Sequence, residues 1–402
     1  MKILFFSQYF WPENFRINEV ASHFHKNGNK VKVLTTNPSY PNKDIFNDFY
    51  KKNKKFDYYK GIEVLRIPTF ARRRNDYSII LNYMTFFLSS FIGGVYKLIS
   101  VKFDFVFIFG TSPILSALPG IFIKKIFKKK IILWVLDLWP NNLIELKRIK
   151  NKVIIIILKK LVKYIYDNSD LIIVQSKSFK TEIEEITNRK CIYIPSWPED
   201  IGDDEKVLAP EIIKEENKIN ILFTGNIGEA QSIESVIECA KILRKEKIAK
   251  WIFVGSGRWK SKIVKLIRDN NLENEFQLID NVPLSRIKSF FNHADVLFLS
   301  LKKNENFKKT IPGKLFTYLA SGKPIIGMIS GEANKLITES KSGYACEADD
   351  FQALRNNILK FKKLTSSEKL QLGINGKNFS KKYFDKSIIL DNLEKLIFEN
   401  FK

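Results

Sequence analysis

Short apolar runs alternate with longer amphipathic segments along the first half of the chain. The runs have strand length and few polar residues, which is typical of parallel strands buried on both faces. They are residues 3–6, 31–34, 105–109, 131–135 and 171–174. Residues 16–26, between the first two runs, place their apolar side chains on one face of a helix. The pattern predicts a doubly wound α/β domain.

The pattern breaks at Pro195-Ser196-Trp197-Pro198 and at the acidic, polar stretch that follows. It then begins again, with apolar runs at residues 219–223, 251–254, 276–279, 296–299 and 324–327. We therefore expect two α/β domains in series. The predicted boundaries are an N-terminal domain at 1–196, a linker at 197–217, a C-terminal domain at 218–380, and a final helical segment at 381–402. We expect this final segment to pack back across the boundary between the two domains.

Composition narrows the class of protein. Of 402 residues, 45% are apolar and 27% charged, which is globular usage and excludes a disordered or collagenous chain. Three cysteines and three histidines, widely spaced, exclude a disulfide framework and make a metal site built on thiolate or imidazole improbable. A reducing cytoplasm fits this cysteine usage best, and no signal peptide is recognisable at the N-terminus.

The positive charge is concentrated in the N-terminal half. Residues 1–190 contain 33 Lys and Arg against 15 Asp and Glu, whereas the remainder contains 34 against 28. Such a field favours a polyanion, either nucleic acid or an anionic membrane. Nucleic acid is not expected, because no aromatic platform or helix-turn-helix motif is recognisable.

One segment, residues 77–96, is twenty residues long without a charge and is long enough to span a bilayer. Asn82, the Gly93-Gly94 pair and the position of the segment inside an α/β pattern argue against a span. We expect a buried helix or one that lies at a membrane interface.

In open α/β sheets ligands bind beyond the carboxyl ends of the strands. Gly225, Asn226 and Gly228 follow the first strand of the second domain, and Gly255 and Gly257 follow the next strand. Glycines there let the backbone turn tightly and approach a phosphate. A single glycine after a strand is more often a plain turn, and it is the occurrence of two such loops on adjacent strands that favours a nucleotide site.

A third candidate lies at Pro312-Gly313-Lys314, at the start of a predicted helix. Free N–H groups at such a helix start, together with the Lys314 side chain, suit a diphosphate. The alternative is a helix start with a solvated lysine.

In the first domain, Asp137 follows the strand at 131–135 and Glu13 lies in an aromatic-rich loop after the first strand. Both positions suit a sugar site. Asp137 is also explained as a turn or N-cap residue, and Glu13 as a charge at the start of a helix near Phe15.

Read together, these segments resemble the retaining glycosyltransferases of family 4, which have the GT-B fold. The segments that carry the resemblance are KILFFSQYFWPENFRINEVASHF, VKVLTTNPSYP, WVLDLWP, IYIPSWPED, ILFTGNIGEAQSIESVIECAKIL, FVGSGRWKSKI, ADVLFLSL and IPGKLFTYLASGKPII. They cover nearly the whole chain in order. The likeness is greatest to the branch that builds O-antigen and capsule repeat units, including the WbuB-type L-fucosamine transferases.

The resemblance implies a GT-B architecture, in which two Rossmann-like domains face each other across a cleft. It implies a retaining transfer of an N-acetylated hexosamine or deoxyhexosamine from a UDP-linked donor to a polyprenyl-diphosphate-linked saccharide, on the inner face of the bacterial cytoplasmic membrane. Lysines are mixed with apolar residues at 114–132 and 153–166 in the basic half, so an anionic membrane surface is an expected partner. No Asp-x-Asp motif lies in a fitting loop, so neither a cofactor nor a metal is expected.

The same resemblance assigns residues to the two sites. The acceptor side would use Asp137 and Glu13. The donor side would use Gly225, Asn226, Gly228, Gly255, Gly257, Arg258, Val282 by its backbone, Gly313, Lys314, Leu315 and Thr317.

This chain departs from the family pattern at several of these positions. Asn226 and Gln231 stand where many members have an Arg and a Lys, and Thr317 stands where a glutamate usually binds the ribose. Two other functions are kept open. One is a nucleotide-sugar epimerase on the same architecture, which would use the same donor loops; the other is a catalytically weak partner protein in a glycan-assembly complex, which Lys309 and Thr317 motivate.

Overall fold

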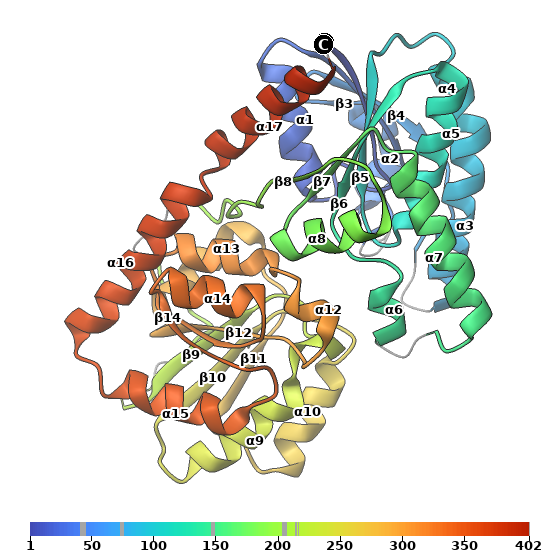
Figure 1. The fold of residues 1–402 in the computed structure, drawn as a ribbon. Coiled ribbons are helices and arrows are strands. Elements are labelled where there is room, and N and C mark those ends of the chain that lie inside the picture. Colours follow the sequence, from blue (N-terminus) through green and yellow to red (C-terminus); the bar gives the residue numbers. More distant parts are fainter. Residues whose placement is uncertain are drawn as a thin grey trace. The chain divides into compact units, whose positions relative to one another are not determined.

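The structure is a computed structural model that describes the chain except residues 41–45, 73–75, 146–148, 203–206, 214, 216 and 402. The predicted linker at 197–217 therefore lies partly outside the described residues. The chain forms two compact units, one of Met1–Ile194 with Leu390–Lys402 and one of Pro195–Ile389. Each unit is built around one sheet (Figure 1).

The sheet of the first unit has the strand order β3-β4-β2-β1-β5-β6-β7-β8. Its strands are β1 (Lys2–Phe6), β2 (Lys30–Thr36), β3 (Tyr58–Tyr59), β4 (Ile62–Ile67), β5 (Phe105–Gly110), β6 (Lys130–Val135), β7 (Leu171–Val174) and β8 (Cys191–Tyr193). All neighbours pair in parallel except the short edge strand β3, which pairs antiparallel with β4. Every residue of β5 is buried, as expected of a strand covered on both faces.

Helices cover both faces of this sheet. They are α1 (Arg16–Lys26), α2 (Asn47–Lys51), α3 (Asp76–Ser89), the π turn η3 (Ser90–Gly94), α4 (Val95–Leu98), α5 (Leu118–Phe127), α6 (Asn141–Glu145), α7 (Lys152–Asp167) and α8 (Lys177–Ile186), with short 3-10 turns at η2 (Asn53–Phe56) and η4 (Ile114–Ala117). Side chains of α3, α4, α5 and α7 share one apolar core with the sheet. On the other face, Phe24 of α1 packs against Phe5 of β1.

The sheet of the second unit has the order β11-β10-β9-β12-β13-β14 and is parallel throughout. Its strands are β9 (Ile219–Thr224), β10 (Ala249–Val254), β11 (Phe276–Ile279), β12 (Val296–Ser300), β13 (Ile325–Met328) and β14 (Gly343–Cys346). In chain order this is 3-2-1-4-5-6, the order of a Rossmann sheet. The strand order reverses between β9 and β12, which is where such sheets bind ligands.

The first six helices of the second unit lie between these strands in the chain, and the last two, α15 and α16, follow β14. They are α9 (Ile233–Arg244), α10 (Lys260–Asp269), α11 (Ile287–His293), α12 (Glu305–Lys308), α13 (Gly313–Ala320), α14 (Glu332–Glu339), α15 (Phe351–Lys362) and α16 (Ser366–Tyr383), with 3-10 turns at η5 (Glu229–Gln231) and η6 (Leu284–Arg286). The N-terminus of α16 is closed by a reciprocal pair of hydrogen bonds between Thr365 and Glu368, which satisfies N–H groups that the helix itself cannot.

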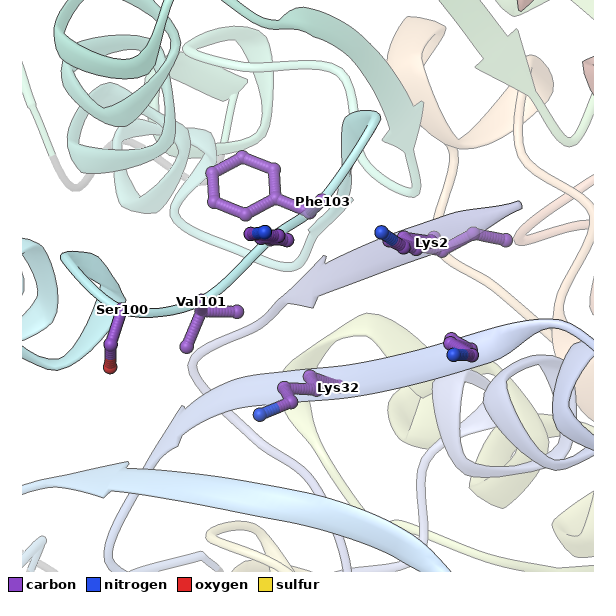
Figure 2. A pocket seen from close by; sticks show the side chains of 8 residues that line it. Lys2, Lys32, Ser100, Val101 and Phe103 are labelled. Carbon is purple, nitrogen blue, oxygen red and sulfur yellow. The ribbon is translucent and has the colours of Figure 1, made fainter.

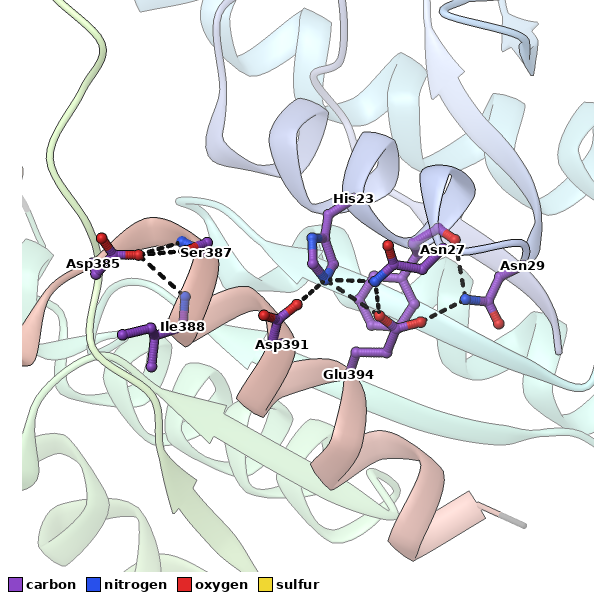
Figure 3. A network of polar contacts seen from close by, with 9 residues as sticks. His23, Asn27, Asn29, Asp385, Ser387, Ile388, Asp391 and Glu394 are labelled. Atoms are coloured by element: carbon purple, nitrogen blue, oxygen red, sulfur yellow. Dashed lines mark hydrogen bonds and ion pairs between the residues drawn. The ribbon is translucent and has the colours of Figure 1, made fainter.

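The final helix, α17 (Lys386–Phe401), begins in the second unit, and its residues from Leu390 onward belong to the first. Figure 3 shows how this last part is held against α1. The buried carboxylate of Glu394 accepts hydrogen bonds from the Asn27 amide at 2.5 Å and the Asn29 amide at 2.6 Å, and lies 3.2 Å from the His23 ring. Further along, the Phe401 ring packs on Phe105 of β5.

Each strand predicted from an apolar run is present, with ends shifted by at most one or two residues. The pattern missed β3, β4, β8 and β14. β3, β8 and β14 have only two to four residues. In β4 the charged residues Glu63 and Arg66 interrupt the apolar run.

Candidate functional site

The loops after β9 and β10 pack against each other backbone to backbone. Gly225 has φ +122° and Gly255 has φ +149°, conformations that side-chain-bearing residues rarely adopt. A Cβ on Gly255 would lie 1.9 Å from the carbonyl oxygen of Gly225. Both positions therefore require glycine, and their close approach brings two of the predicted donor loops together.

Asn226 is enclosed by the two remaining glycines of these loops. A Cβ on Gly257 would lie 2.7 Å from Asn226 Oδ1, and one on Gly228 would lie 2.7 Å from Asn226 Nδ2. The backbone N–H of Ile227 donates to the carbonyl oxygen of Ser256 at 2.9 Å. The absence of side chains at 228 and 257 is thus what makes room for the amide of Asn226.

Lys314 reaches the same loops from the start of α13. Its Nζ lies 3.7 Å from the centre of the Phe223 ring and 3.3 Å from where a Cβ of Gly225 would be. The residue as a whole is half-buried, but Nζ is buried and has no hydrogen-bond partner among the described residues. Burial without a counter-charge lowers the pKa of Lys314 to about 7.

The backbone at this helix start is open as well. The N-cap residue Pro312 provides no side-chain hydrogen bond, and a Cβ added to Gly313 would find no described atom within 4 Å. The first N–H groups of a helix attract anions. A buried, unpaired ammonium beside an open helix N-terminus is an arrangement that an anionic group would complete.

Sequence reasoning missed Tyr318, which fixes α13 against β9. Its hydroxyl oxygen accepts a hydrogen bond from the backbone N–H of Thr224 at 3.0 Å and lies 3.2 Å from the Thr224 hydroxyl. Lys314 and Tyr318 are four residues apart and so share one face of the helix. That spacing was the available signal: a lysine and an aromatic on the face that meets the end of a strand.

Two of the remaining residues predicted for the donor side, Leu315 and Thr317, are buried inside the protein. The side chain of Leu315 is fully buried and its N–H donates to the Pro312 carbonyl oxygen, so this residue belongs to the core. Thr317 is buried, and its hydroxyl accepts a hydrogen bond from the backbone N–H of Glu199 at 3.0 Å. Its hydroxyl oxygen is thus engaged within the protein.

Arg258 and Val282 lie in the loops after β10 and β11. Arg258 is exposed, directly after Gly257. Val282 follows Asn281, whose amide donates to the Ser256 hydroxyl at 2.8 Å. That hydrogen bond connects the loop of Val282 to the loop of Gly255 and Gly257.

In the first unit, Glu13 is a buried carboxylate that holds the loop after β2. Its Oε1 accepts hydrogen bonds from the backbone N–H groups of Ser39 at 2.7 Å and Tyr40 at 2.6 Å. Burial nevertheless dominates and raises the pKa of Glu13 to about 7. A carboxyl group with such a pKa can hold or release a proton near neutral pH.

Asp137 is half-buried directly after β6. Its neighbours are tied to adjacent loops: the Gln175 amide donates to the Leu136 carbonyl oxygen at 2.6 Å, and the Trp139 indole donates to the Ser112 hydroxyl at 2.8 Å. Since β5 lies between β1 and β6, Glu13 and Asp137 follow strands that are two positions apart, at the same edge of the sheet.

Two other features lie away from these loops. A hollow of about 260 Å³ lies at the amino ends of β1 and β2 and is lined by Lys2, Lys32, Ser100 and Phe103 among others (Figure 2). This is the opposite end of the sheet from Glu13 and Asp137. Within the described parts of the chain, no group of three or more His, Cys, Asp or Glu could hold a metal ion.

Two Rossmann-like α/β domains in one chain define the GT-B fold. Residues 204–379, most of the second unit, match the family described as "Glycosyl transferases group 1".

Curated relatives agree with that match. The chain is 25% identical over 266 residues to the probable glycosyltransferase WbjE of Pseudomonas aeruginosa. The matched region covers 62% of this chain and 64% of WbjE. It is 24% identical over 343 residues to WcaI of Escherichia coli K12, a putative colanic acid biosynthesis glycosyl transferase. That matched region covers 80% of this chain and 82% of WcaI. The chain thus spans just under two thirds of the first of these relatives and more of the second.

Solved structures share the whole fold at low identity. A sucrose-phosphate synthase from Thermosynechococcus elongatus superposes with a TM-score of 0.73 at 13% identity, over 100% of this chain and 99% of that one. Anabaena Alr3699/HepE, solved in complex with UDP and glucose, superposes with a TM-score of 0.69 at 13% identity, over 99% of this chain and 100% of that one.

Proposed function

We propose that this protein is a glycosyltransferase that moves a sugar from a UDP-linked donor to a polyprenyl-diphosphate-linked saccharide during assembly of a bacterial surface glycan. The observation that carries the proposal is the buried ammonium of Lys314, which has no hydrogen-bond partner among the described residues and lies beside the glycine loops after β9 and β10. The group 1 glycosyl transferase match over the same unit supports it, as does the similarity to WcaI, which is named for colanic acid biosynthesis.

The donor diphosphate would lie at the N-terminus of α13. There Lys314 and the first N–H groups of the helix would stabilise the negative charge that develops as the bond from the anomeric carbon to the phosphate oxygen breaks. Gly313 and Gly225 would let the diphosphate approach the backbone. In this role a lysine performs the charge neutralisation that a divalent metal performs elsewhere, so we expect transfer to proceed in the presence of a chelator.

Asp137 would orient the acceptor hydroxyl in the first unit. The acceptor oxygen forms the new bond to the anomeric carbon on the face from which the diphosphate leaves, and the proton of the hydroxyl passes to the leaving phosphate oxygen. This course retains the anomeric configuration. Glu13, with its pKa near 7, is the second group on this side that can exchange a proton at neutral pH.

The sugar is proposed to be an N-acetylated hexosamine or deoxyhexosamine, following the O-antigen branch that the sequence resembles. The decisive experiment is to incubate the protein with a panel of nucleotide sugars and a polyprenyl-diphosphate-linked acceptor, with and without EDTA, and to weigh the products. A mass increase of one sugar supports the proposal. Isomerisation of the nucleotide sugar without acceptor would instead indicate an epimerase, and binding without turnover would indicate a non-catalytic partner.

A further inference from the structure

The helical segment Tyr77–Leu98 has its apolar side outward. It is long and apolar enough to cross a membrane, and only 28% of its most apolar window is buried. The large side chains on its outer side are mostly more than half exposed. They are Tyr77, Ile80, Met84, Leu88, Ile92 and Tyr96.

Three polar residues of the segment face the protein instead. Ser78, Asn82 and Ser90 are each no more than 2% exposed. The Asn82 amide donates to the Phe70 carbonyl oxygen at 2.6 Å and accepts from the Gln8 amide at 2.9 Å. An ordinary surface helix has the reverse arrangement, so the outer face is suited to an apolar environment rather than to water.

The π turn η3 keeps the outer residues on one face. Successive residues of an α-helix are turned by about 100°, so positions spaced by four would drift around the helix along its length. A π turn contains an extra residue, and η3 occurs just before Tyr96. With that insertion Tyr96 returns to the side occupied by Met84 and Leu88, which gives a continuous apolar stripe.

Two neighbouring helices extend this stripe. The Phe91 ring of η3 packs on Phe122 of α5 at 4.6 Å, and Lys125 of α5 donates to the Tyr164 hydroxyl of α7 at 2.7 Å. Figure 1 shows α3, α5 and α7 on one side of the first unit. Exposed apolar side chains on α5 and α7 are Phe122, Ile126, Val153, Ile154, Ile156 and Ile157.

The charged residues within these helical stretches are all lysines. Residues 77–98, 118–130 and 152–160 contain no Asp or Glu. Exposed lysines among them are Lys97, Lys125, Lys128, Lys130, Lys152, Lys159 and Lys160. Aliphatic side chains interleaved with lysines match the boundary between acyl chains and anionic headgroups. A protein partner would need an equally large apolar face that is also acidic.

We propose that the outer stripe of Tyr77–Leu98, together with the exposed faces of α5 and of α7 up to Lys160, forms a docking face for an anionic phospholipid bilayer. The segment lies in the interface and does not span, because its inner side is bound to the sheet: the Phe86 ring stacks on Phe6 of β1 at 5.8 Å, and Gly94 lies against Leu34.

The docking face adjoins the proposed acceptor side. Asn82, on the inner side of α3, approaches the Ser39 hydroxyl at 3.4 Å, and the Ser39 N–H donates to Glu13. This step rests on the proposed function. Through this contact a lipid-linked acceptor would reach the loop of Glu13 while its tail stays in the bilayer.

The test compares two matched substitutions in the full chain. Leu88 on the docking face and Leu370 on α16 are 58% and 62% exposed. Leu88→Glu and Leu370→Glu therefore place the same charge at two helix positions of similar exposure. Partitioning is measured by flotation with vesicles of phosphatidylcholine, with and without phosphatidylglycerol. We expect the parent and Leu370→Glu to float with the anionic vesicles, and Leu88→Glu to bind about tenfold more weakly. Joint substitution of Lys159 and Lys160 by Gln should reduce the preference for phosphatidylglycerol.

Equal flotation of the two glutamate variants would overturn the proposal, as would a parent that binds neither vesicle. A parent dimer that Leu88→Glu converts to a monomer would assign the face to a second copy of the chain and would also overturn it. Affinity for UDP, measured on the same samples, should be equal in all variants. That measurement separates failure of the docking face from failure of the proposed function.

Discussion

The Lys314 ammonium lies 3.7 Å from the centre of the Phe223 ring, buried and without a hydrogen-bond partner among the described residues. The ring face attracts a cation, but it does not replace the hydration that burial removes. A fold retains such a group at a cost in stability, so its retention is explained when a ligand supplies the missing counter-charge.

The first prediction concerns that cost. Because the pKa of Lys314 in the folded chain is about 7, against a usual 10.5, the unfolded chain holds a proton that the folded chain has lost between these two pH values. The free energy of unfolding should therefore rise with pH across this window. Lys314→Met should flatten the rise and stabilise the ligand-free protein at pH 7 by about 1–3 kcal/mol. Urea denaturation at several pH values measures both effects.

The control for this series is Lys360→Met. Lys360 is exposed and lies 4.4 Å from the Tyr344 ring centre, so its substitution should leave the slope unchanged. If the parent and Lys314→Met show the same pH slope, Lys314 is not buried as described.

The second prediction contrasts two glycines. Gly255→Ala should destabilise the second unit by about 2 kcal/mol or more, because its φ is +149° and its Cβ would meet the Gly225 carbonyl oxygen. Gly313→Ala should leave the thermal midpoint unchanged, since nothing described lies near the added methyl. It should nevertheless weaken UDP binding, because the methyl would occupy the space proposed for the diphosphate. UDP affinity equal to the parent's would show that this space is not used.

The third prediction concerns Glu13. Its pKa of about 7 lies above the usual 4.5, so the folded chain holds a proton that the unfolded chain has lost between these values, and stability should fall as pH rises across that window. Glu13→Gln keeps an oxygen for the two backbone N–H groups and removes the charge. It should therefore be more stable than the parent at pH 8, by about 1 kcal/mol, while Glu19→Gln on α1 should not. Loss of stability in Glu13→Gln at pH 8 would show that the charge itself is needed.

The fourth prediction is that Asp137→Asn folds normally and binds UDP as the parent does, yet transfers sugar about a hundredfold more slowly. Circular dichroism, calorimetry and product mass measure the three properties. Full activity would reduce Asp137 to a turn residue.

Sequence alone was sufficient for the parts of the fold that depend on local pattern. β5 is an unbroken apolar run, and β9 is interrupted only by Asn220 before its final Thr224. The tight turns at Gly225 and Gly255 could be predicted because a glycine directly follows each strand. The burial of Lys314 was not predictable, because it depends on Phe223 and Tyr318, which different elements bring together. The role of Leu315 was likewise hidden, since a motif position does not show which way a side chain turns.

The helix at Tyr77–Leu98 shows the same limit. Its twenty uncharged residues were visible in the sequence, but the side that packs on the sheet is selected by Asn82 and Phe86 through contacts with β1 and the loop after it. Only the structure shows that Ser78, Asn82 and Ser90 face inward.

Calorimetric titration of UDP and of uridine into the parent, Lys314→Ala and Lys314→Arg tests the central claim most directly. Losing a charge-assisted contact to the diphosphate costs about 1.5–3 kcal/mol. Lys314→Ala should therefore bind UDP at least about tenfold more weakly, bind uridine as the parent does, and be partly restored by arginine. UDP affinity within about twofold of the parent in Lys314→Ala would remove Lys314 from the site and contradict the account.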